Sequence, residues 1–313
     1  MLGIRHPLMS APMAGVSGGR LADAFSQAGG LGLIGVGYNG ADWIDSQIDL
    51  ISPAVPFGVG FITWRLQEQP QLLQAALRRQ PRAVFLSFGE IDRFAAQVHD
   101  SGACLIAQVQ TLAQAHRARD AGADIIVAQG GEAGGHSGQR STMPFVPAVV
   151  DAMKDTPVVA AGGIADGRGI AASLALGACG ALIGTALYTS EESLAHPKAK
   201  NRAVQAHGDD TVKSEVFDRI RGLTWPADWR LRTLANEFTQ RWAQDLPGLE
   251  QSIAQEKQRY AEAAQAGDVR TAAVIVGEAI DLVHAAETTA VIVDTLMRQA
   301  EQVIKGFQDH LKP

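Results

Sequence analysis

Short apolar runs alternate with amphipathic stretches through the first 190 residues of the chain. Four segments share one layout, in which a helix-like stretch ends at a glycine and a small residue then leads into an apolar run. Their glycines, Gly29, Gly102, Gly122 and Gly177, are placed to adopt the left-handed conformation that ends a helix. Because the following runs are apolar without strict alternation, we expect strands that are buried on both faces.

Counting these and similar runs gives eight expected strands, near residues 8–12, 31–36, 56–61, 83–88, 104–109, 124–129, 157–161 and 180–184. Helical stretches separate most of them, at residues 19–28, 71–79, 90–100, 111–121, 143–153 and 167–176. Strand–helix units in this number and spacing predict an α/β fold, a (β/α)8 TIM barrel. A doubly wound open sheet is the alternative, but the segment APMAGVSGG after the first strand lacks the GxGxxG spacing that would favour it.

The pattern changes after Thr189. Residues 190–283 show no clear strand, and residues 225–238 and 249–267 look like helices with charged faces. We therefore expect a smaller, mainly helical subdomain there, and the connection at residues 266–284 is expected to bring backbone near the active face.

The last stretch, residues 288–307, predicts a helix that packs back on the barrel. Its apolar side chains at helical spacing are Ile292, Leu296, Val303 and Phe307. The expected domains are thus a cofactor-binding barrel at 1–190, the helical subdomain at 191–285 and the C-terminal helix at 286–313.

The composition is that of an ordinary globular protein, with 46% hydrophobic and 19% charged residues among 313. A net charge of −6 gives no electrostatic case for binding nucleic acid or an anionic membrane, although backbone amides can still bind a small anion. Cys104 and Cys179 lie in apolar runs, so we expect two buried, unpaired thiols and a reducing compartment. With no signal-peptide pattern and no uninterrupted apolar span, the sequence indicates a cytoplasmic protein. No Cys/His spacing indicates a metal site.

In a (β/α)8 barrel the active site lies at the carboxyl ends of the strands. After the seventh and eighth strands come Gly162, Gly163, Gly184 and Thr185, which offer free amides, close backbone approach and one hydroxyl. This is the usual place for a phosphate in such barrels. For either loop alone, tight strand-to-helix turns explain the glycines equally well. The two loops together favour phosphate binding.

The segment AQGGEAGGHSG, residues 128–138, follows the sixth strand. Gln129 ends that strand, and Gly134 and Gly135 remove the β-carbons that would keep backbone away from a flat cofactor ring. His136 then projects over the barrel mouth, where an imidazole can take a proton near neutral pH. A surface histidine on a flexible hairpin is the alternative, and the length and glycine density of the loop favour a functional role.

Other strand ends supply further candidates. Ala11, Pro12 and Met13 follow the first strand and could line a ring, with plain barrel packing as the alternative. Gln108 ends the fifth strand and could hydrogen-bond a heteroaromatic edge, or be an interior polar residue satisfied by water. Ser87 and Phe88 end the fourth strand and could wall the substrate space.

Three segments together resemble the nitronate monooxygenase family, also called 2-nitropropane dioxygenase-like. They are AQGGEAGGHSG, VVAAGGIADGRGIAASLALGACGALIGT and SAPMAGVSGGRLADAFSQAGGLGLIG, and the resemblance spans nearly the whole chain. It implies an FMN-binding TIM barrel with a smaller helical domain. It also implies flavin-dependent oxidation of alkyl nitronates, with propionate 3-nitronate as one candidate, by O2 to a carbonyl compound and nitrite.

By motif, the resemblance implies that His136 is the active-site base and that Gln129 and Gly134 contact the flavin. It also implies that Gly163 is the phosphate glycine after strand seven and that Ala11 to Met13 lie along the flavin, and the segment from Leu182 to Thr185 matches the family's strand-eight segment with its final Gly-Thr retained. Two positions depart from the family pattern. Gly60 stands where asparagine is frequent, and Leu182 where glutamine is common; both bear on flavin contacts and substrate choice.

Two other classes remain open. Flavin-dependent enoyl-acyl-carrier-protein reductases share EAGGH-like and AAGGIADG-like motifs, and NADH:quinone reductases share the scaffold, so an NAD(P)H-dependent reductase is the nearest alternative. A barrel that has lost its cofactor and only binds a ligand is less favoured, because His136 and both phosphate loops are present. The expected partners are a small-molecule substrate and O2, with no nucleic acid and no membrane. The sequence does not set the oligomeric state.

Overall fold

Eight short parallel strands curl around a common apolar core in the computed structural model, which describes residues 1–310. These strands are β1 (Leu8–Ser10), β2 (Gly32–Gly35), β3 (Phe57–Ile62), β4 (Ala83–Ser87), β5 (Cys104–Val109), β6 (Ile125–Gln129), β8 (Val158–Ala161) and β9 (Gly180–Ile183). Their order is β1-β9-β8-β6-β5-β4-β3-β2, and a single parallel bridge between Met9 and Leu31 brings β1 beside β2. The predicted barrel is confirmed, with every strand end within two residues of the expected position.

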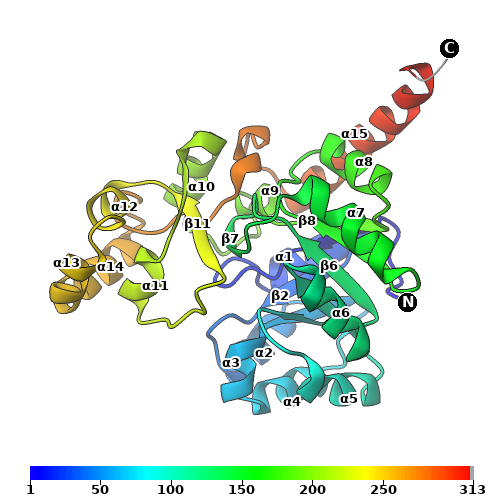
Figure 1. Ribbon diagram of the computed structural model, residues 1–313, viewed down its shortest axis with the longest axis horizontal. Helices are drawn as coiled ribbons and strands as arrows, with labels where there is room; N and C mark the ends of the chain where they lie inside the picture. Colours follow the sequence, from blue (N-terminus) through cyan, green and yellow to red (C-terminus); the bar gives the residue numbers. More distant parts are fainter. Residues whose placement is uncertain (311–313) are drawn as a thin grey trace.

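Helices cover the outside of the barrel (Figure 1). They are α1 (Gly19–Gln27), α2 (Ala41–Ile48), α3 (Thr63–Glu68), α4 (Gln71–Leu77), α5 (Asp92–Asp100), α6 (Leu112–Asp120), α7 (Thr142–Met153), α8 (Gly167–Ala175) and α9 (Thr185–Tyr188). All six expected helices are confirmed, whereas α2, α3 and α9 are additional. Helix α2 escapes sequence analysis because it buries only Ile44 and Ile48.

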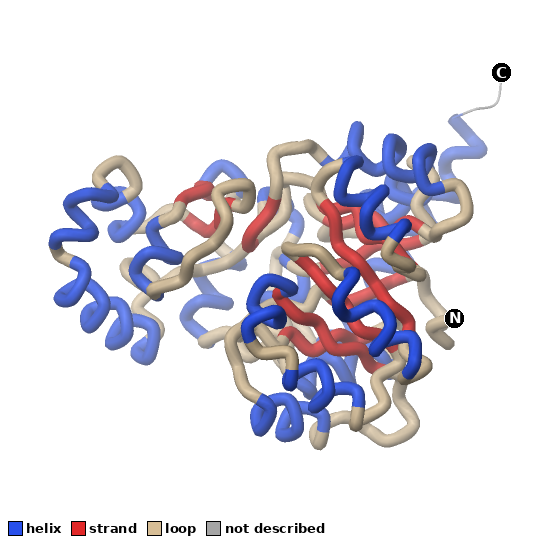
Figure 2. Tube along the Cα trace, turned by 60° about the horizontal axis from the view of Figure 1, so that its bottom comes forward, coloured by secondary structure: helices blue, strands red, loops and turns tan. Residues whose placement is uncertain are grey.

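The glycines predicted to end helices do so. Gly29, Gly102, Gly122 and Gly177 have φ angles of 106°, 79°, 91° and 91°, in the left-handed region that glycine adopts without steric cost. Each therefore turns the chain from a helix directly into the next strand. Figure 2 shows the strands gathered in the interior with helices around them.

Alternate strand residues form two apolar layers. One set, including Leu33, Phe85 and Val127, packs in the barrel interior, and the other packs strands against helices. Because side chains alternate along a strand, residues that follow the interior set at the carboxyl ends also point into the barrel. Gln108 and Gln129 have this parity.

Residues 190–285, which we call the accessory region, lie to one side of the barrel in Figure 1. Their elements are α10 (Pro197–Val204), η1 (Gly208–Asp210), β10 (Thr211–Ser214), α11 (Val216–Arg221), β11 (Arg230–Leu234), α12 (Glu237–Trp242), α13 (Leu246–Gln251), α14 (Ile253–Ala266) and η2 (Glu278–Leu282). Helix α14 confirms the helical prediction for 249–267. A separate apolar cluster built around Phe217, Leu231 and Phe238 stabilises this region.

The prediction that residues 190–283 lack strands is wrong. Strand β11 pairs antiparallel with β10 on one side and with β7 (Gly135–Ser137) on the other. Residues 230–234 were therefore wrongly expected to be helical. The sequence RLRTL is short and half polar, and its polar Arg232 is used in an ion pair with Glu278.

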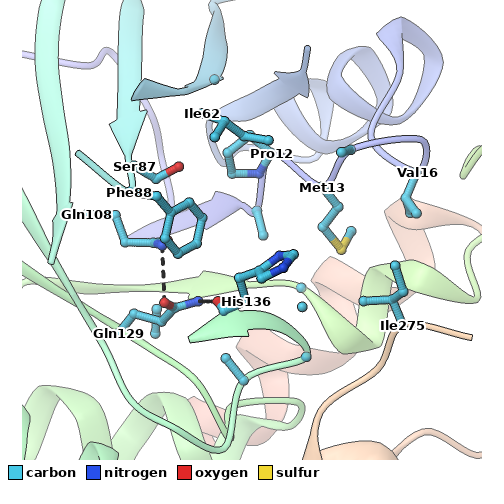
Figure 3. A pocket seen from close by; sticks show the side chains of 18 of the residues that line it. Pro12, Met13, Val16, Ile62, Ser87, Phe88, Gln108, Gln129, His136 and Ile275 are labelled. Carbon is cyan, nitrogen blue, oxygen red and sulfur yellow. Dashed lines mark hydrogen bonds between the residues drawn. The ribbon is translucent and has the colours of Figure 1, made fainter. Parts of the chain in front are cut away.

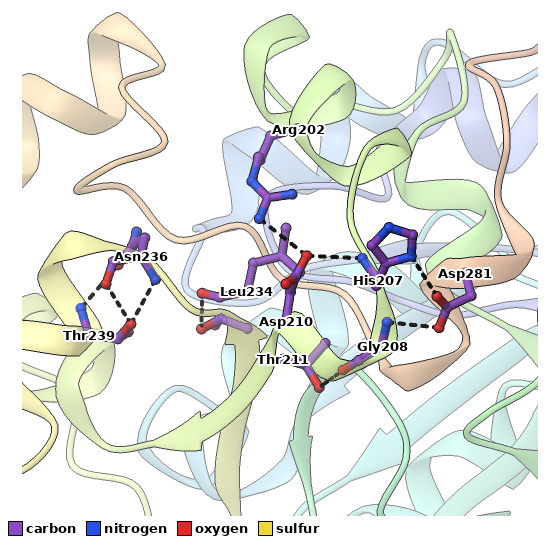
Figure 4. Close-up of polar contacts among 10 residues, drawn as sticks. Arg202, His207, Gly208, Asp210, Thr211, Leu234, Asn236, Thr239 and Asp281 are labelled. Carbon is purple, nitrogen blue, oxygen red and sulfur yellow. Dashed lines mark hydrogen bonds and ion pairs between the residues drawn. The ribbon is translucent and has the colours of Figure 1, made fainter.

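Side-chain contacts tie the accessory elements together (Figure 4). Asp281 in η2 accepts a hydrogen bond from the Gly208 amide at 2.8 Å and lies 3.0 Å from Nδ1 of His207. Asn236 and Thr239 form a reciprocal capping box at the start of α12. These contacts fix the strand pair on which the site segment β7 depends.

The C-terminal helix α15 (Thr289–His310) packs against α8, as predicted. Gly167 allows this approach, because a β-carbon there would clash with the backbone of Ala300. Phe307 was expected to pack on the barrel, but it is 42% exposed, because the last turns of α15 extend beyond the body of the protein (Figure 1).

The two cysteines are free, and only Cys104 is buried. Cys179 was also expected to be buried, and that prediction is wrong: it stands just before β9, at the end of the turn made by Gly177. None of the helices within residues 1–310 is both long and apolar enough to cross a membrane.

Candidate active site

A pocket lies at the carboxyl ends of the barrel strands, between the barrel and the accessory region (Figure 3). The twelve residues singled out from the sequence all line it: Ala11, Pro12, Met13, Gln108, Gln129, Gly134, Gly135, His136, Gly162, Gly163, Gly184 and Thr185. Ser87 and Phe88 line it as well. The fold thus brings together segments that are up to 174 residues apart, from Ala11 to Thr185.

The amides of Gln108 and Gln129 meet at one side of the pocket (Figure 3), and Gln110 joins them from outside its lining. The Oε1 atom of Gln129 accepts hydrogen bonds from Nε2 of Gln108 at 3.2 Å and from Nε2 of Gln110 at 2.9 Å. Nε2 of Gln129 donates to the carbonyl oxygen of His136 at 3.3 Å. Gln108 is therefore satisfied by another side chain, and the network fixes where the His136 backbone lies.

Glycine backbone forms another part of the lining. Gly162 and Gly163 have φ angles of 95° and 71°, which other residues rarely adopt. A β-carbon on Gly184 would sit 3.4 Å from Cβ of Ala11 and 3.7 Å from Sδ of Met13, so it would enter the pocket. Thr185 accepts a hydrogen bond from the Gly277 amide at 2.9 Å, which brings the 266–284 connection to the site as predicted.

Close packing against Pro12 accounts for glycine at position 60, one of the two departures from the family pattern. A β-carbon on Gly60 would clash with Cβ of Pro12, and one on Gly35 would clash with the backbone of Pro12 and Met13. The segment after β1 therefore occupies the space that side chains of β2 and β3 would need. Leu182, the other departure, is buried in the barrel interior and gives the pocket an apolar wall.

His136 is held in a strand and not in a flexible hairpin. It lies in β7 opposite Leu231 of β11, and only 8% of the residue is exposed. Its Nε2 atom lies 2.9 Å from Oδ2 of Asp218, on α11 of the accessory region. The side chains of His136 and Asp218 are 7% and 6% exposed.

Aromatic side chains enclose the imidazole. The ring of Trp225 stacks on His136 with centroids 3.4 Å apart and planes at 8°, and Phe88 meets His136 edge-on. Nε1 of Trp225 donates to the hydroxyl of Tyr38 at 2.8 Å, which fixes the indole. Burial lowers the pKa of His136 below its usual value, Asp218 opposes that shift, and the charge of Arg221 adds to it.

Sequence analysis missed Asp218, Arg221 and Trp225. Arg221 and Trp225 line the pocket, and Asp218 is hydrogen-bonded to His136, which also lines it. Asp218 is 82 residues away from His136 along the chain, and no spacing rule connects them. The one available signal was a pair of tryptophans, Trp225 and Trp229, in a short loop that also contains Pro226.

A family profile and a curated relative identify the family, and two solved structures share the fold. The sequence profile described as "Nitronate monooxygenase" matches residues 1–71 and 66–304. The nitronate monooxygenase npaC of Metarhizium robertsii is 32% identical over 98% of this chain and 94% of its own length. The fold is similar to FabK from Thermotoga maritima (TM-score 0.85, 28% identity, 99% and 97% of the two chains). It is also similar to nitroalkane oxidase from Streptomyces ansochromogenes (TM-score 0.80, 26% identity, 97% and 98%).

Proposed function

Since the chain belongs to the nitronate monooxygenase family, we propose that it is an FMN-dependent enzyme that oxidises alkyl nitronates with O2 to a carbonyl compound and nitrite. The observation that carries this proposal is a buried, hydrogen-bonded histidine in a pocket that is lined by glycine backbone, glutamine amides and apolar side chains. Propionate 3-nitronate and ethylnitronate are the substrates to test first.

Several residues that line the pocket support a flavin mononucleotide as the cofactor. Gly162, Gly163, Gly184 and Thr185 would hold the phosphate, because all four line the pocket just after β8 and β9, where backbone amides and the Thr185 hydroxyl can meet an anion. The amides of Gln108 and Gln129 would face polar ring atoms, and Pro12 and Met13 would lie along the ring. When bound, the flavin supplies the electron transfer of the reaction.

His136 would take the α-proton of a neutral nitroalkane. Its lowered pKa keeps the imidazole uncharged near neutral pH, which is the form that accepts a proton. A nitronate has already lost that proton, so His136 would only position it. The two kinds of substrate therefore place different demands on the same side chain.

We expect His136→Asn to keep the flavin and to lose activity selectively. The value of kcat/KM for neutral nitroethane should fall on the order of 10²-fold to 10⁴-fold, the usual contribution of a general base, while that for ethylnitronate falls less than about tenfold. Steady-state oxygen uptake at fixed pH measures both. His116→Asn, on the exposed face of α6, is the matched control. Equal losses on both substrates would show that His136 is not the base.

Anaerobic reduction separates this proposal from its alternatives. Purified enzyme is mixed in parallel with propionate 3-nitronate, ethylnitronate, NADH and NADPH, and flavin bleaching is followed by stopped flow. Rapid reduction by a nitronate with little response to NADH or NADPH supports the proposal. Rapid reduction by either nicotinamide instead supports a reductase. A colourless protein that takes up no FMN supports a barrel that only binds a ligand.

A further inference from the structure

We propose that Asp218 is a positioning residue for His136: its carboxylate accepts the hydrogen on Nε2 and so keeps the lone pair on Nδ1, where it can take the α-proton. The proposal deepens the function proposed above and rests on it, because it assumes that His136 is the base. It also assigns to the accessory region a part in the chemistry, since Asp218 lies on α11 and His136 on β7.

The hydrogen-bond geometry sets the tautomer. Oδ2 of Asp218 lies 2.9 Å from Nε2 of His136, and a carboxylate can only accept a hydrogen bond. Nε2 therefore carries the hydrogen, and a neutral imidazole then has its lone pair on Nδ1. Within residues 1–310 no hydrogen bond engages Nδ1, so that nitrogen is left for a ligand in the pocket.

Asp218 is itself fixed by a second partner. Its Oδ1 atom accepts a hydrogen bond from Nη2 of Arg221 at 3.0 Å, while Oδ2 serves His136. Arg221 is anchored in turn, because its Nε donates to the carbonyl oxygen of Phe217 at 2.8 Å. Each carboxylate oxygen thus has its own partner, which prevents rotation of the group. The imidazole of His136 is therefore held at Nε2 by Asp218 and on one ring face by the stacked indole of Trp225.

The charged and titratable groups around the pair are few. Asp218 and Arg221 come from α11, Tyr38 from the loop after β2, and Tyr260 from α14. Burial raises the pKa of both tyrosines, so they stay uncharged near neutral pH. The strand opposite β7 contributes Leu231. Asp218 is thus the group that favours the protonated imidazole, and Arg221 opposes it.

The proton balance follows from this arrangement. The α C–H bond of the nitroalkane breaks, the proton moves to Nδ1, and the electron pair passes into the nitro group to give the nitronate. The imidazolium that forms faces the carboxylate of Asp218, which stabilises the positive charge in a buried site. No oxidant or other reactant takes part in this step.

The tautomer can be measured on the wild-type holoenzyme. Long-range ¹⁵N–¹H correlation spectra of histidine-labelled protein at pH 7.5 report which ring nitrogen carries hydrogen, and the spectrum of His136→Asn identifies the His136 signals. We expect the Nε2–H form. The Nδ1–H form would overturn the proposal, whether or not the enzyme oxidises nitronates.

The variant Asp218→Asn tests the role in turnover. Its amide can present NH2 to Nε2, which would move the hydrogen to Nδ1, the wrong nitrogen for the proposed step. We expect kcat/KM for nitroethane to fall on the order of tenfold to 100-fold, and that for ethylnitronate to change less than about threefold. Because the Asp218 charge raises the pKa of His136, the acid limb of the nitroethane profile should also move to lower pH.

Glu215→Gln is the matched control, because it removes a carboxylate at the start of the same helix. That carboxylate pairs with Arg219 and Arg230 and not with His136. Flavin content and melting temperature check that each variant folds. Equal losses on both substrates, or an unmoved acid limb, would contradict the role of Asp218. Failure of the wild type to oxidise any nitronate would instead refute the proposed function, and the tautomer measurement would still decide the His136–Asp218 contact.

Discussion

Gly60 and Pro12 show how one missing β-carbon shapes the pocket wall. The segment after β1 folds over the ends of β2 and β3, and only glycine at positions 35 and 60 leaves room for it. An asparagine at position 60, frequent in the family, would have to displace Pro12 in this structure. Flavin contacts on this side would then come from the Pro12–Met13 segment.

We expect Gly60→Asn to destabilise the protein by about 1–3 kcal/mol, the usual cost of overfilling a packed site, and to weaken FMN binding. Urea unfolding and fluorescence titration with FMN measure the two effects. Gly40→Asn is the control, because a β-carbon at Gly40 meets open space and asparagine suits the position before helix α2. Unchanged stability and affinity in Gly60→Asn would mean that Pro12 moves aside freely.

The first residue of helix α15, Thr289, is hydrogen-bonded to Glu192 of the accessory region. Oε2 of Glu192 accepts hydrogen bonds from the amide of Thr289 at 2.9 Å and from its hydroxyl at 2.7 Å. A carboxylate at the start of a helix accepts a hydrogen bond from a free backbone amide and interacts favourably with the positive end of the helix dipole.

Glu192→Ala should therefore lower the free energy of unfolding by about 1–2 kcal/mol, as the loss of a helix cap does. Glu191→Ala changes the exposed neighbour and should have less than half of that effect. Urea denaturation of both variants gives the comparison. Similar destabilisation by the two substitutions would show that the contact with Thr289 does not matter.

The barrel elements could be predicted because each carries its own local signal. A glycine such as Gly122 ends a helix, and an apolar run such as 125–129 follows at once, so every unit could be recognised alone. Strands β7, β10 and β11 have three to five residues and mixed polarity, and they become strands only by pairing with one another. Tertiary context decided them, not propensity.

The pocket residues divide in the same way. Those at strand ends, such as Gln129 and Gly184, could be placed once the barrel was recognised, because the fold fixes where strand ends meet. Asp218 and Trp225 could not, because their position depends on how the accessory region docks. Long-range contacts of this kind leave no periodic trace in one sequence.

Cofactor binding should stabilise the folded chain. If FMN binds only the folded state, an FMN concentration 100 times its Kd should add about 2.7 kcal/mol. For a chain of 313 residues this corresponds to a rise of about 4 °C in Tm, measurable by scanning calorimetry. Riboflavin, which lacks the phosphate, should give a smaller rise at the same concentration. Equal shifts would contradict a phosphate role for Gly162, Gly163, Gly184 and Thr185.

Because β7 pairs with β11, the proposed base and the proposed cofactor site are built by different stretches of the sequence. Barrel strand ends line most of the pocket, whereas residues 218–231 clamp His136 at its edge, its face and its backbone neighbour. Substitutions within this one stretch would therefore change the surroundings of the proposed base and leave the barrel residues of the pocket as they are. If His136 is the base, such substitutions would change which C–H bonds the enzyme attacks without disturbing the proposed cofactor site.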